Sequence, residues 1–368
     1  MGMAMKLALL GLGNMLFSRL SAALDGVGVP PIIKMVLFAA FAALGLVLSM
    51  WIWQESLLYM PSIPNPENPL FGSIKSLADG PAGFRSPRER GLPYMDVILI
   101  ADDGIKCHGW FIPAPNDTKA HALTLLFSHE NAGSIGLRLP MLYALRQHLR
   151  CNILAYDYRG YGDSEEATIG EEGLMRDAHA AYNWLVQKDR GIDPNKILLY
   201  GASLGGAVSI QLAKDLCEEG SSSSPSSNKP KPLGVVVCNT FTSIAAMMAA
   251  KYSFLDWPFV RKHMLRMHWK SIEHVAKVTV PLLLIVGLED ELVPPHHTKE
   301  LHAAAVNSPL TYIREVPRGT HNDTWAKGGV DYVKWLEEFA LRAEAAAVQE
   351  NLDGLRETLD QAESKKDQ

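Results

Sequence analysis

Ile197-Leu198-Leu199-Tyr200-Gly201-Ala202-Ser203-Leu204-Gly205-Gly206 leads from a short apolar run into a second apolar segment with helical character. The spacing Gly-x-Ser-x-Gly between a strand and a helix is typical of a nucleophile elbow, a turn so sharp that the serine takes a strained backbone conformation. Gly201 and Gly205 supply the room that the strand and the helix need to pass each other. An ordinary Gly/Ser-rich turn is the alternative, and the strand before and helix after favour the elbow.

The elbow predicts where Ser203 and its neighbour lie. The serine side chain would stand at the carboxyl edge of a sheet, and the backbone N–H of Leu204, at the start of the helix, could stabilise an oxyanion. A serine hydroxyl is inert at neutral pH without a base, and the base needs a third group that holds its tautomer. An acid and a histidine are therefore expected elsewhere at the same edge.

Asp290 is the predicted acid. It follows the apolar run Val280 to Val286, which places it in a loop at the carboxyl edge that also carries the serine. Glu289 and Glu291 flank it as rivals, and the turn closed by Pro294 favours Asp290.

His321 is the predicted base. It lies in a glycine-rich loop after the last apolar run, Leu310 to Val316, and its position completes the order serine, aspartate, histidine. A lone loop histidine is usually only solvated, and the chain has 12 histidines, but this order sets His321 apart. The pair His296-His297 is interpreted as surface.

A second oxyanion donor is expected in the loop after the first buried strand. That loop reads Ser128-His129-Glu130-Asn131-Ala132-Gly133, and we assign the role to the backbone N–H of Asn131. In the loop after the next strand, Asp157 and Arg159 are expected to fix the backbone through charge-assisted hydrogen bonds.

Composition excludes some classes of protein. With 368 residues, of which 48% are hydrophobic, the chain can fold one large domain with additions or two small ones. Its 35 basic and 40 acidic residues give a net charge of −5, so no nucleic-acid partner is expected. The scattered cysteines show no metal-like spacing, and we expect small buried hydrophobes, with a disulfide as the alternative. They are Cys107, Cys151, Cys217 and Cys238.

Met35 to Trp53 is the predicted membrane anchor. This uncharged run of ~19 residues would reach ~28 Å as a helix, which matches the hydrocarbon core of a bilayer. A buried core helix is the alternative. Basic residues precede the run and Glu55 follows it, so the positive-inside rule predicts a cytosolic segment 1–34 and a single-pass type II protein. Residues 54–93, rich in proline and glycine, are expected to be a linker.

Residues 94–347 are predicted to form one α/β domain. Short apolar runs alternate with helical segments, which indicates a mostly parallel sheet with flanking helices, and an opening hairpin gives it an antiparallel edge. Residues 240–277 are too long for one crossover helix and predict a small helical cap, or else two ordinary surface helices. Residues 220–232 form a low-complexity loop, and 348–368 form a charged tail, helical or disordered.

The chain resembles the Bem46-like branch of the alpha/beta hydrolases. The segments that carry the resemblance, between about Leu123 and Trp325, are HENAGSIGLRLP, AYDYRGYGDSEE, LLYGASLGGAVSIQLA, GLEDELVPP and RGTHNDTW, a little over half of the chain. The resemblance implies the alpha/beta-hydrolase fold, one N-terminal anchor, and Ser203, Asp290 and His321 as a catalytic triad.

Glu130 departs from the family pattern, His-Gly-Asn-Ala-Gly, in which its position is glycine. A carboxylate that faced the oxyanion pocket would oppose the charge that develops there. We expect it to turn outward and pair with Arg138 or Arg159, because a buried carboxylate without a partner is costly.

These observations predict a membrane serine hydrolase that cleaves an ester, thioester or amide through an acyl-enzyme at Ser203. Its expected partners are an acyl ester, thioester or lipid-like substrate and the bilayer, with no metal or cofactor. A noncatalytic scaffold of the same fold is one alternative, and a proline-directed serine peptidase is another.

Overall fold

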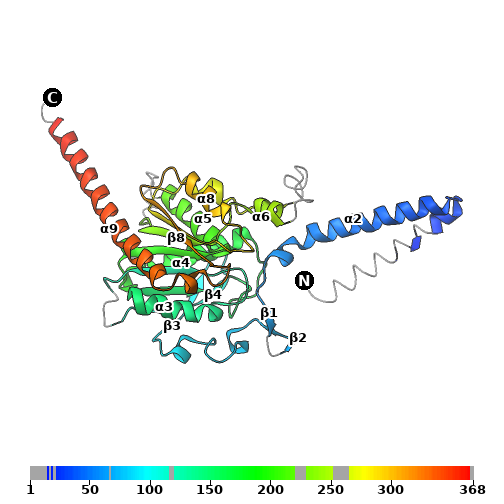
Figure 1. Cartoon of the computed structure of the whole chain (residues 1–368), viewed down its shortest axis with the longest axis horizontal. Helices are drawn as coiled ribbons and strands as arrows, with labels where there is room; N and C mark the ends of the chain where they lie inside the picture. Colours follow the sequence, from blue (N-terminus) through cyan, green and yellow to red (C-terminus); the bar gives the residue numbers. More distant parts are fainter. Residues whose placement is uncertain are drawn as a thin grey trace. The chain divides into compact units, whose positions relative to one another are not determined.

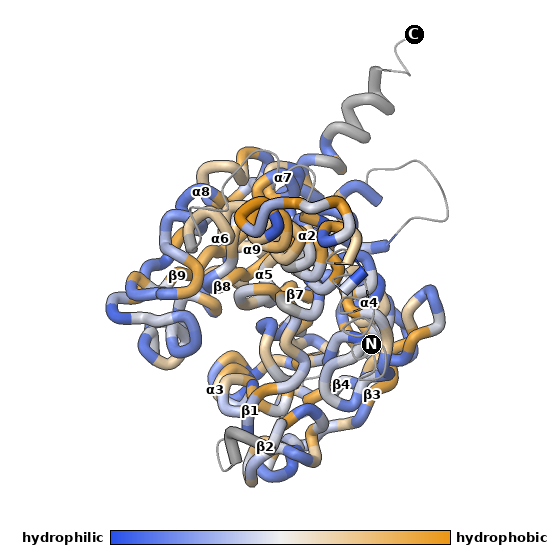
Figure 2. Tube along the Cα trace, turned by 90° about the vertical axis from the view of Figure 1, so that its right-hand side faces the viewer, coloured by the Kyte–Doolittle hydropathy of each residue, from blue (hydrophilic) through white to orange (hydrophobic). Residues whose placement is uncertain are grey.

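The computed structural model describes residues 15, 18–19, 22–65, 68–115, 120–219, 229–251 and 265–364. The chain divides into two compact units, Met1–Leu57 and Leu58–Gln368. The first unit consists mainly of the helix α2 (Pro31–Leu58). Its apolar residues are coloured orange in Figure 2. Its stretch Pro31–Ser49 is, among the described residues, the one helical segment long and apolar enough to cross a membrane. None of that stretch is buried, which argues against the core-helix alternative.

The second unit contains an eight-stranded sheet with the order β10-β9-β8-β7-β5-β6-β4-β3. Its strands β3, β4 and β8 are labelled in Figure 1. Only β4 runs antiparallel to its neighbours, β3 and β6, and every other pair is parallel. The predicted mostly parallel sheet with a hairpin at one edge is therefore confirmed. The strands are β3 (Met95–Ile100), β4 (Lys106–Ile112), β5 (Thr124–Ser128), β6 (Asn152–Tyr156), β7 (Ile197–Ala202), β8 (Gly234–Cys238), β9 (Leu282–Gly287) and β10 (Thr311–Val316).

Helices cover both faces of this sheet, which explains why its central strands are apolar throughout. In β8, Val235 and Val237 belong to one core cluster and Val236 to the other, because successive side chains point to opposite faces. One face is covered by α4 (Glu171–Leu185), α5 (Leu204–Glu219), α7 (Ser271–Val275) and α8 (His296–Ala304). The other is covered by α3 (Leu139–Leu149) and α9 (Thr324–Ser364).

The strand order places the candidate site. The chain runs from β5 to β6 on one side and then to β7 on the other side of β5, which makes the carboxyl end of β5 a point where the connections diverge. Ligands of open α/β sheets bind at such points. Ser128 at the end of β5 is paired with Gly201 of β7, so the loops that follow these two strands begin at the same level.

The stretch expected to be a linker is more ordered than a tether. It contains a two-stranded antiparallel sheet, β1 (Ile63–Asn65) and β2 (Asn68–Ile74). Leu77 and Leu92 are buried in the core on the α3 side of the large sheet. Burial of these apolar side chains fixes the later part of the stretch on the large sheet.

The expected cap and tail are described in part. Residues 220–228, in the low-complexity loop, and 252–264, in the middle of the expected cap, lie outside the described residues. Before the second gap, α6 (Ile244–Lys251) packs Met247 and Met248 against the core. α9 has one non-helical residue, Gly329, and extends into the charged tail as far as Ser364. All four cysteines are buried and free, so the disulfide alternative does not occur.

Candidate active site

Ser203 occupies the turn between β7 and α5 in a strained backbone conformation. Its φ of 52° lies in the left-handed region, which non-glycine residues rarely adopt and which costs of order 1–3 kcal/mol. Two contacts hold it there: its N–H donates to Cys238 O at 2.9 Å, and Thr240 Oγ1 donates to its carbonyl at 2.8 Å. The strand end of β8 thus fixes the turn of β7.

Gly201 and Gly205 are required by the close approach of strand and helix. A Cβ on Gly201 would lie 2.0 Å from Gly205 O, and one on Gly205 would lie 2.0 Å from Ser128 O. Any side chain at either position would push the helix away from the strands. The turn at Ser203 therefore has the backbone geometry predicted for a nucleophile elbow.

Asp290 and His321 are in direct contact. His321 Nδ1 lies 2.8 Å from Asp290 Oδ2, and the side chains are 6% and 0% exposed, respectively. The other carboxylate oxygen accepts the N–H groups of Leu292 and Val293 at 2.9 and 2.8 Å. These two donors orient the carboxylate toward the imidazole. The rival Glu289 is exposed, and its carboxylate makes no such contact with the residues that the structure describes.

Asn239, which sequence reasoning missed, joins the acid and histidine loops. Its Nδ2 donates to Thr320 O, His321 O and Thr324 Oγ1 at 3.2, 3.1 and 2.9 Å, and its Oδ1 accepts the N–H of Gly287 at 2.9 Å. It follows β8 with a φ of 49°, a conformation for which asparagine is enriched. The available signal was an asparagine directly after a buried strand, at the same carboxyl edge as the serine.

Ser203 and His321 are linked through β8 rather than directly. No hydrogen bond joins their side chains within the described ranges. Ser203 N is bound to Cys238 O, and the next residue, Asn239, is bound to His321 O. Catalytic hydrogen bonds are often long and tighten only when substrate binds. The arrangement thus brings the predicted acid and base together and holds the serine in the adjacent turn.

The two predicted oxyanion donors lie just after the carboxyl ends of two neighbouring strands, β7 and β5. Leu204 is the first residue of α5, and Asn131 lies in the loop His129–Gly133 after β5, called the oxyanion loop below. Neither backbone N–H has an acceptor among the residues that the structure describes. Two unpaired N–H groups at one sheet edge are what a developing oxyanion requires.

Glu130 pairs with Arg138, one of its two expected partners. Arg138 Nε lies 2.7 Å from Glu130 Oε2 without pointing along the hydrogen-bond direction, so the contact is an ion pair. Both side chains are only 15% exposed, so the carboxylate is less outward than expected. Arg159 instead pairs with Asp103 and Asp177, at 2.6 and 2.8 Å, and fixes the loop after β6 as predicted.

Replacing Glu130 by glycine is expected to leave kcat for a small ester within about tenfold of wild type. The ion pair neutralises the carboxylate, and Arg138 still donates to Ala132 O at 2.7 Å when Glu130 is gone. Steady-state kinetics on the Glu130→Gly chain tests this. A gain of a hundredfold or more would show instead that the carboxylate suppresses turnover.

His129, the first residue of the oxyanion loop, forms a buried pair with Asp157. His129 Nε2 lies 3.7 Å from Asp157 Oδ1, and both side chains are 0% exposed. Burial lowers the pKa of His129 to about 3 and raises the pKa of Asp157 to about 8, so both are neutral at pH 7. The Asp157 carboxyl also accepts the N–H of Ile135 at 2.8 Å.

This pair predicts that the free energy of unfolding falls as the pH rises from 6.5 to 8. In the folded chain Asp157 keeps a proton up to about pH 8, whereas the unfolded carboxyl loses it near 3.8, so its contribution is lost as the pH rises. His129 has the opposite effect, because the unfolded imidazole takes up a proton below 6.5. Between 3.8 and 6.5 the two effects cancel. From pH 6.5 to 8 the free energy of unfolding should therefore fall by about 2 kcal/mol.

Urea denaturation of the full chain in detergent at pH 6.5 and 8 measures this slope. The Asp157→Asn chain should lack it, because asparagine has no proton to lose and keeps the carbonyl that accepts from Ile135. An identical slope in both chains would assign the pH dependence to other groups.

The expectation for the adjacent histidines is half wrong. His296 is exposed as predicted, whereas His297 is fully buried because α8 packs its inner face against the core. Thr242 Oγ1 lies 2.9 Å from His297 Nδ1, and burial lowers the pKa of His297 to about 4. The polar ring can be buried because Thr242, which is distant in sequence, forms a hydrogen bond with one of its nitrogens.

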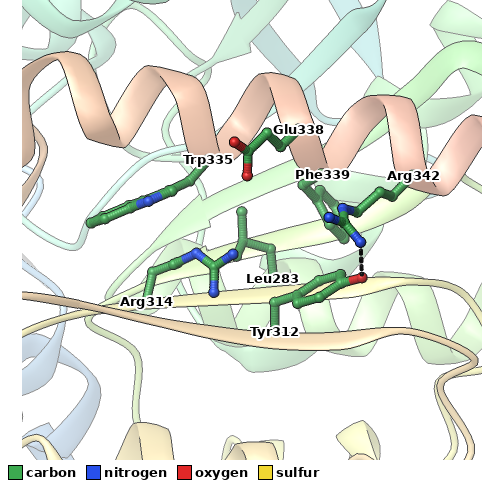
Figure 3. Close-up of a pocket in the computed structure, with 7 residues that line it drawn as sticks. All are labelled: Leu283, Tyr312, Arg314, Trp335, Glu338, Phe339 and Arg342. Atoms are coloured by element: carbon green, nitrogen blue, oxygen red, sulfur yellow. Dashed lines mark hydrogen bonds between the residues drawn. The ribbon is translucent and has the colours of Figure 1, made fainter.

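Figure 3 shows a shallow hollow that lies away from this site, between α9 and the strands β9 and β10. It contains none of the predicted site residues, and the Arg342–Tyr312 hydrogen bond of 3.3 Å crosses one side. Its lining residues are Leu283, Tyr312, Arg314, Trp335, Glu338, Phe339 and Arg342. The described part of the chain has no cluster of three or more histidine, cysteine, aspartate or glutamate side chains able to hold a metal ion.

Comparison with known sequences relates the chain to several hydrolase-like proteins. Residues 170–339 match the prolyl oligopeptidase family. The alpha/beta hydrolase domain-containing protein WAV2 of Arabidopsis thaliana is 36% identical over 302 residues, 78% of this chain and 89% of the relative. An uncharacterized membrane protein of Saccharomyces cerevisiae is 34% identical and covers 66% of this chain and 79% of its own length. Protein bem46 of Schizosaccharomyces pombe is 27% identical, with coverages of 78% and 85%.

Solved structures share the fold at low sequence identity. The Pyrococcus furiosus esterase Pf2001 is 19% identical with a TM-score of 0.55, and covers 70% of this chain and 94% of its own. A puromycin-hydrolyzing peptidase of Mycobacterium tuberculosis is 15% identical with a TM-score of 0.53, and covers 72% and 40%. These similarities confirm the predicted alpha/beta-hydrolase fold.

Proposed function

This chain belongs to the Bem46-like family of alpha/beta hydrolases, and from that premise we propose that it is a membrane-anchored serine hydrolase that forms an acyl-enzyme at Ser203. The observation that carries the proposal is the 2.8 Å contact between His321 Nδ1 and Asp290 Oδ2 at the edge that also holds the strained serine. The substrate is an acyl ester, thioester or amide with a lipid-like acyl group.

In the proposed reaction, Ser203 Oγ attacks the acyl carbonyl while His321 Nε2 accepts the hydroxyl proton. Asp290 keeps the Nδ1–H tautomer of His321 and stabilises the imidazolium. The N–H groups of Leu204 and Asn131 bind the oxyanion. His321 then protonates the leaving group, and a water molecule, activated by the same imidazole, releases the acid and restores the serine.

Two alternatives make different predictions. A noncatalytic scaffold would be favoured by a repulsive carboxylate in the oxyanion pocket, but Glu130 is paired with Arg138. A serine peptidase would use the same three residues, and the match of residues 170–339 to the prolyl oligopeptidase family supports testing it.

The full chain in detergent should be assayed with p-nitrophenyl esters of two to sixteen carbons, a palmitoyl thioester and a glycyl-prolyl p-nitroanilide. The proposal predicts turnover of esters and thioester, with a release burst that equals the enzyme concentration for substrates whose deacylation is slower than acylation. Cleavage of the anilide alone would favour the peptidase, and no turnover of any probe would favour the scaffold.

The proposed topology places the N-terminus in the cytosol and the hydrolase domain across the membrane. It is supported by the apolar helix Pro31–Ser49, by the charge difference around it, and by a yeast relative called a membrane protein. In sealed microsomes the domain should resist added protease, and Asn116, in a glycosylation sequon that lies outside the described residues, should carry a glycan. Asn116→Gln should remove the size shift. Complete digestion without detergent would reverse the orientation.

A further inference from the structure

The last residue of α2 and the two residues that follow it bind the oxyanion loop. These residues, Leu58–Met60, are called the docking segment here. Asn131 Nδ2 donates to Leu58 O at 2.5 Å, and Gly133 N donates to Met60 O at 2.9 Å. Met60 also forms a parallel bridge with Ala132. The docking segment therefore adds a short strand-like edge to the loop that carries a predicted oxyanion donor.

The docking segment also contacts a residue outside the oxyanion loop. Tyr59 is 3% exposed in the core, and its hydroxyl accepts the indole N–H of Trp269 at 3.0 Å. Trp269 is fully buried at the base of the expected cap, and its backbone N–H donates to Glu171 at 3.0 Å. The docking segment is thus held between the oxyanion loop and the cap base.

Three side chains from outside the oxyanion loop donate hydrogen bonds to it. Tyr158 OH donates to His129 O at 3.0 Å, Arg138 donates to Ala132 O, and Tyr161 OH donates to Asn131 Oδ1 at 3.0 Å. These partners come from the body of the domain. Two further partners, Leu58 O and Met60 O, come from the docking segment. They bind Asn131, which carries the predicted oxyanion donor, and Gly133, which ends the loop.

We propose that the docking segment is a positioning element of the oxyanion hole, so that the chain after the membrane anchor sets the catalytic competence of the site. The inference rests on the proposed function. A donor contributes only if it lies about 2.7–3.1 Å from the oxyanion, and loss of one donor costs about 10²–10³ in kcat. Release of Leu58 and Met60 from the loop would let the N–H of Asn131 turn out of that range. Leu58 and Met60 would then position part of the active site.

The experiment compares full-length variants in detergent. Asn131→Leu removes the bond to Leu58 O without adding charge, whereas Tyr161→Phe removes the other bond of the same amide together with the contact of the Tyr161 hydroxyl with the backbone of Met60. Asn307→Leu is the matched control, because the exposed Asn307 Nδ2 donates to Ala276 O at 2.6 Å, the same kind of contact far from the site. Tyr59→Phe weakens the docking segment from the Trp269 side and leaves Asn131 intact, which keeps the test valid if Asn131→Leu does not fold.

Two readouts are measured: steady-state kinetics on p-nitrophenyl acetate, and hydrogen exchange of the peptide that contains residues 131–133. For Asn131→Leu we expect kcat to fall about a hundredfold with KM within about threefold, and the Gly133 amide to exchange at least tenfold faster. Tyr59→Phe should lower kcat about fivefold and Tyr161→Phe by less than Asn131→Leu. Asn307→Leu should match wild type in both readouts.

Unchanged kcat in folded Asn131→Leu and Tyr59→Phe chains would overturn the inference, as would unchanged exchange of the Gly133 amide. A rise in KM with kcat unchanged would also overturn it, because it would indicate lost substrate binding. An inactive wild-type chain would overturn the proposed function instead, and the exchange data would still decide whether the docking segment holds the loop.

Discussion

Ser203→Ala is expected to abolish turnover of p-nitrophenyl esters, with kcat lower by about 10⁴–10⁶. Alanine removes the oxygen that forms the acyl-enzyme and leaves the backbone of the elbow in place, because the contacts to Cys238 and Thr240 use main-chain atoms of residue 203. Residual turnover would come from substrate binding and the oxyanion donors alone. The melting temperature should change little, since no hydrogen bond of Ser203 Oγ occurs among the described residues.

Ser209→Ala is the matched control for this loss. Ser209 is a buried serine on the helix that follows the elbow, and its hydroxyl has no hydrogen-bond partner among the described residues. Its removal should leave kcat and KM near wild type. Wild-type turnover by the Ser203→Ala chain would mean that another residue is the nucleophile.

Asp290→Asn should lower kcat by about 10⁴ while the fold is kept. Asparagine preserves the shape and can still accept from Leu292 and Val293 through its carbonyl, but its amide then faces His321 Nδ1 as a donor. The imidazole would be held with its proton on Nε2, where it cannot accept the serine proton. KM should be nearly unchanged, because the carboxylate does not bind substrate.

Glu289→Gln is the control for Asp290→Asn, because it removes a neighbouring carboxylate that is exposed. It should leave kcat within about twofold. If the two substitutions lowered kcat equally, the acid would not be Asp290 specifically, and a general loss of negative charge in this loop would explain the effect.

Local sequence was enough to predict the sheet and the edge of it that carries the candidate site. The runs Lys106–Ile112, Asn152–Tyr156 and Gly234–Cys238 begin and end in the structure where their apolar patterns do. Strands buried on both faces have no polar alternation, so their ends are marked by the first polar or glycine residue. Since parallel strands put their carboxyl ends at one edge, the polar residues after these runs identified the predicted site.

Contacts between distant residues could not be predicted in this way. His297 looks like a surface histidine until Thr242, 55 positions earlier, is brought to its Nδ1. Asn239 has no role until the acid and histidine loops close around it. The proline-rich pattern of the expected linker likewise contains no sign that Leu58 meets Asn131, 73 positions later, because that contact uses a backbone carbonyl that every residue has.

Labelling of the full chain with a fluorophosphonate, followed by peptide mass spectrometry, tests the central claim most directly. The reagent requires a serine that is made nucleophilic by its base and an oxyanion hole that receives the phosphonyl oxygen. The account predicts a single adduct on Ser203, and at least a thousandfold slower labelling of the Asp290→Asn chain. An adduct on another residue, or labelling of the Ser203→Ala chain at the wild-type rate, would contradict it.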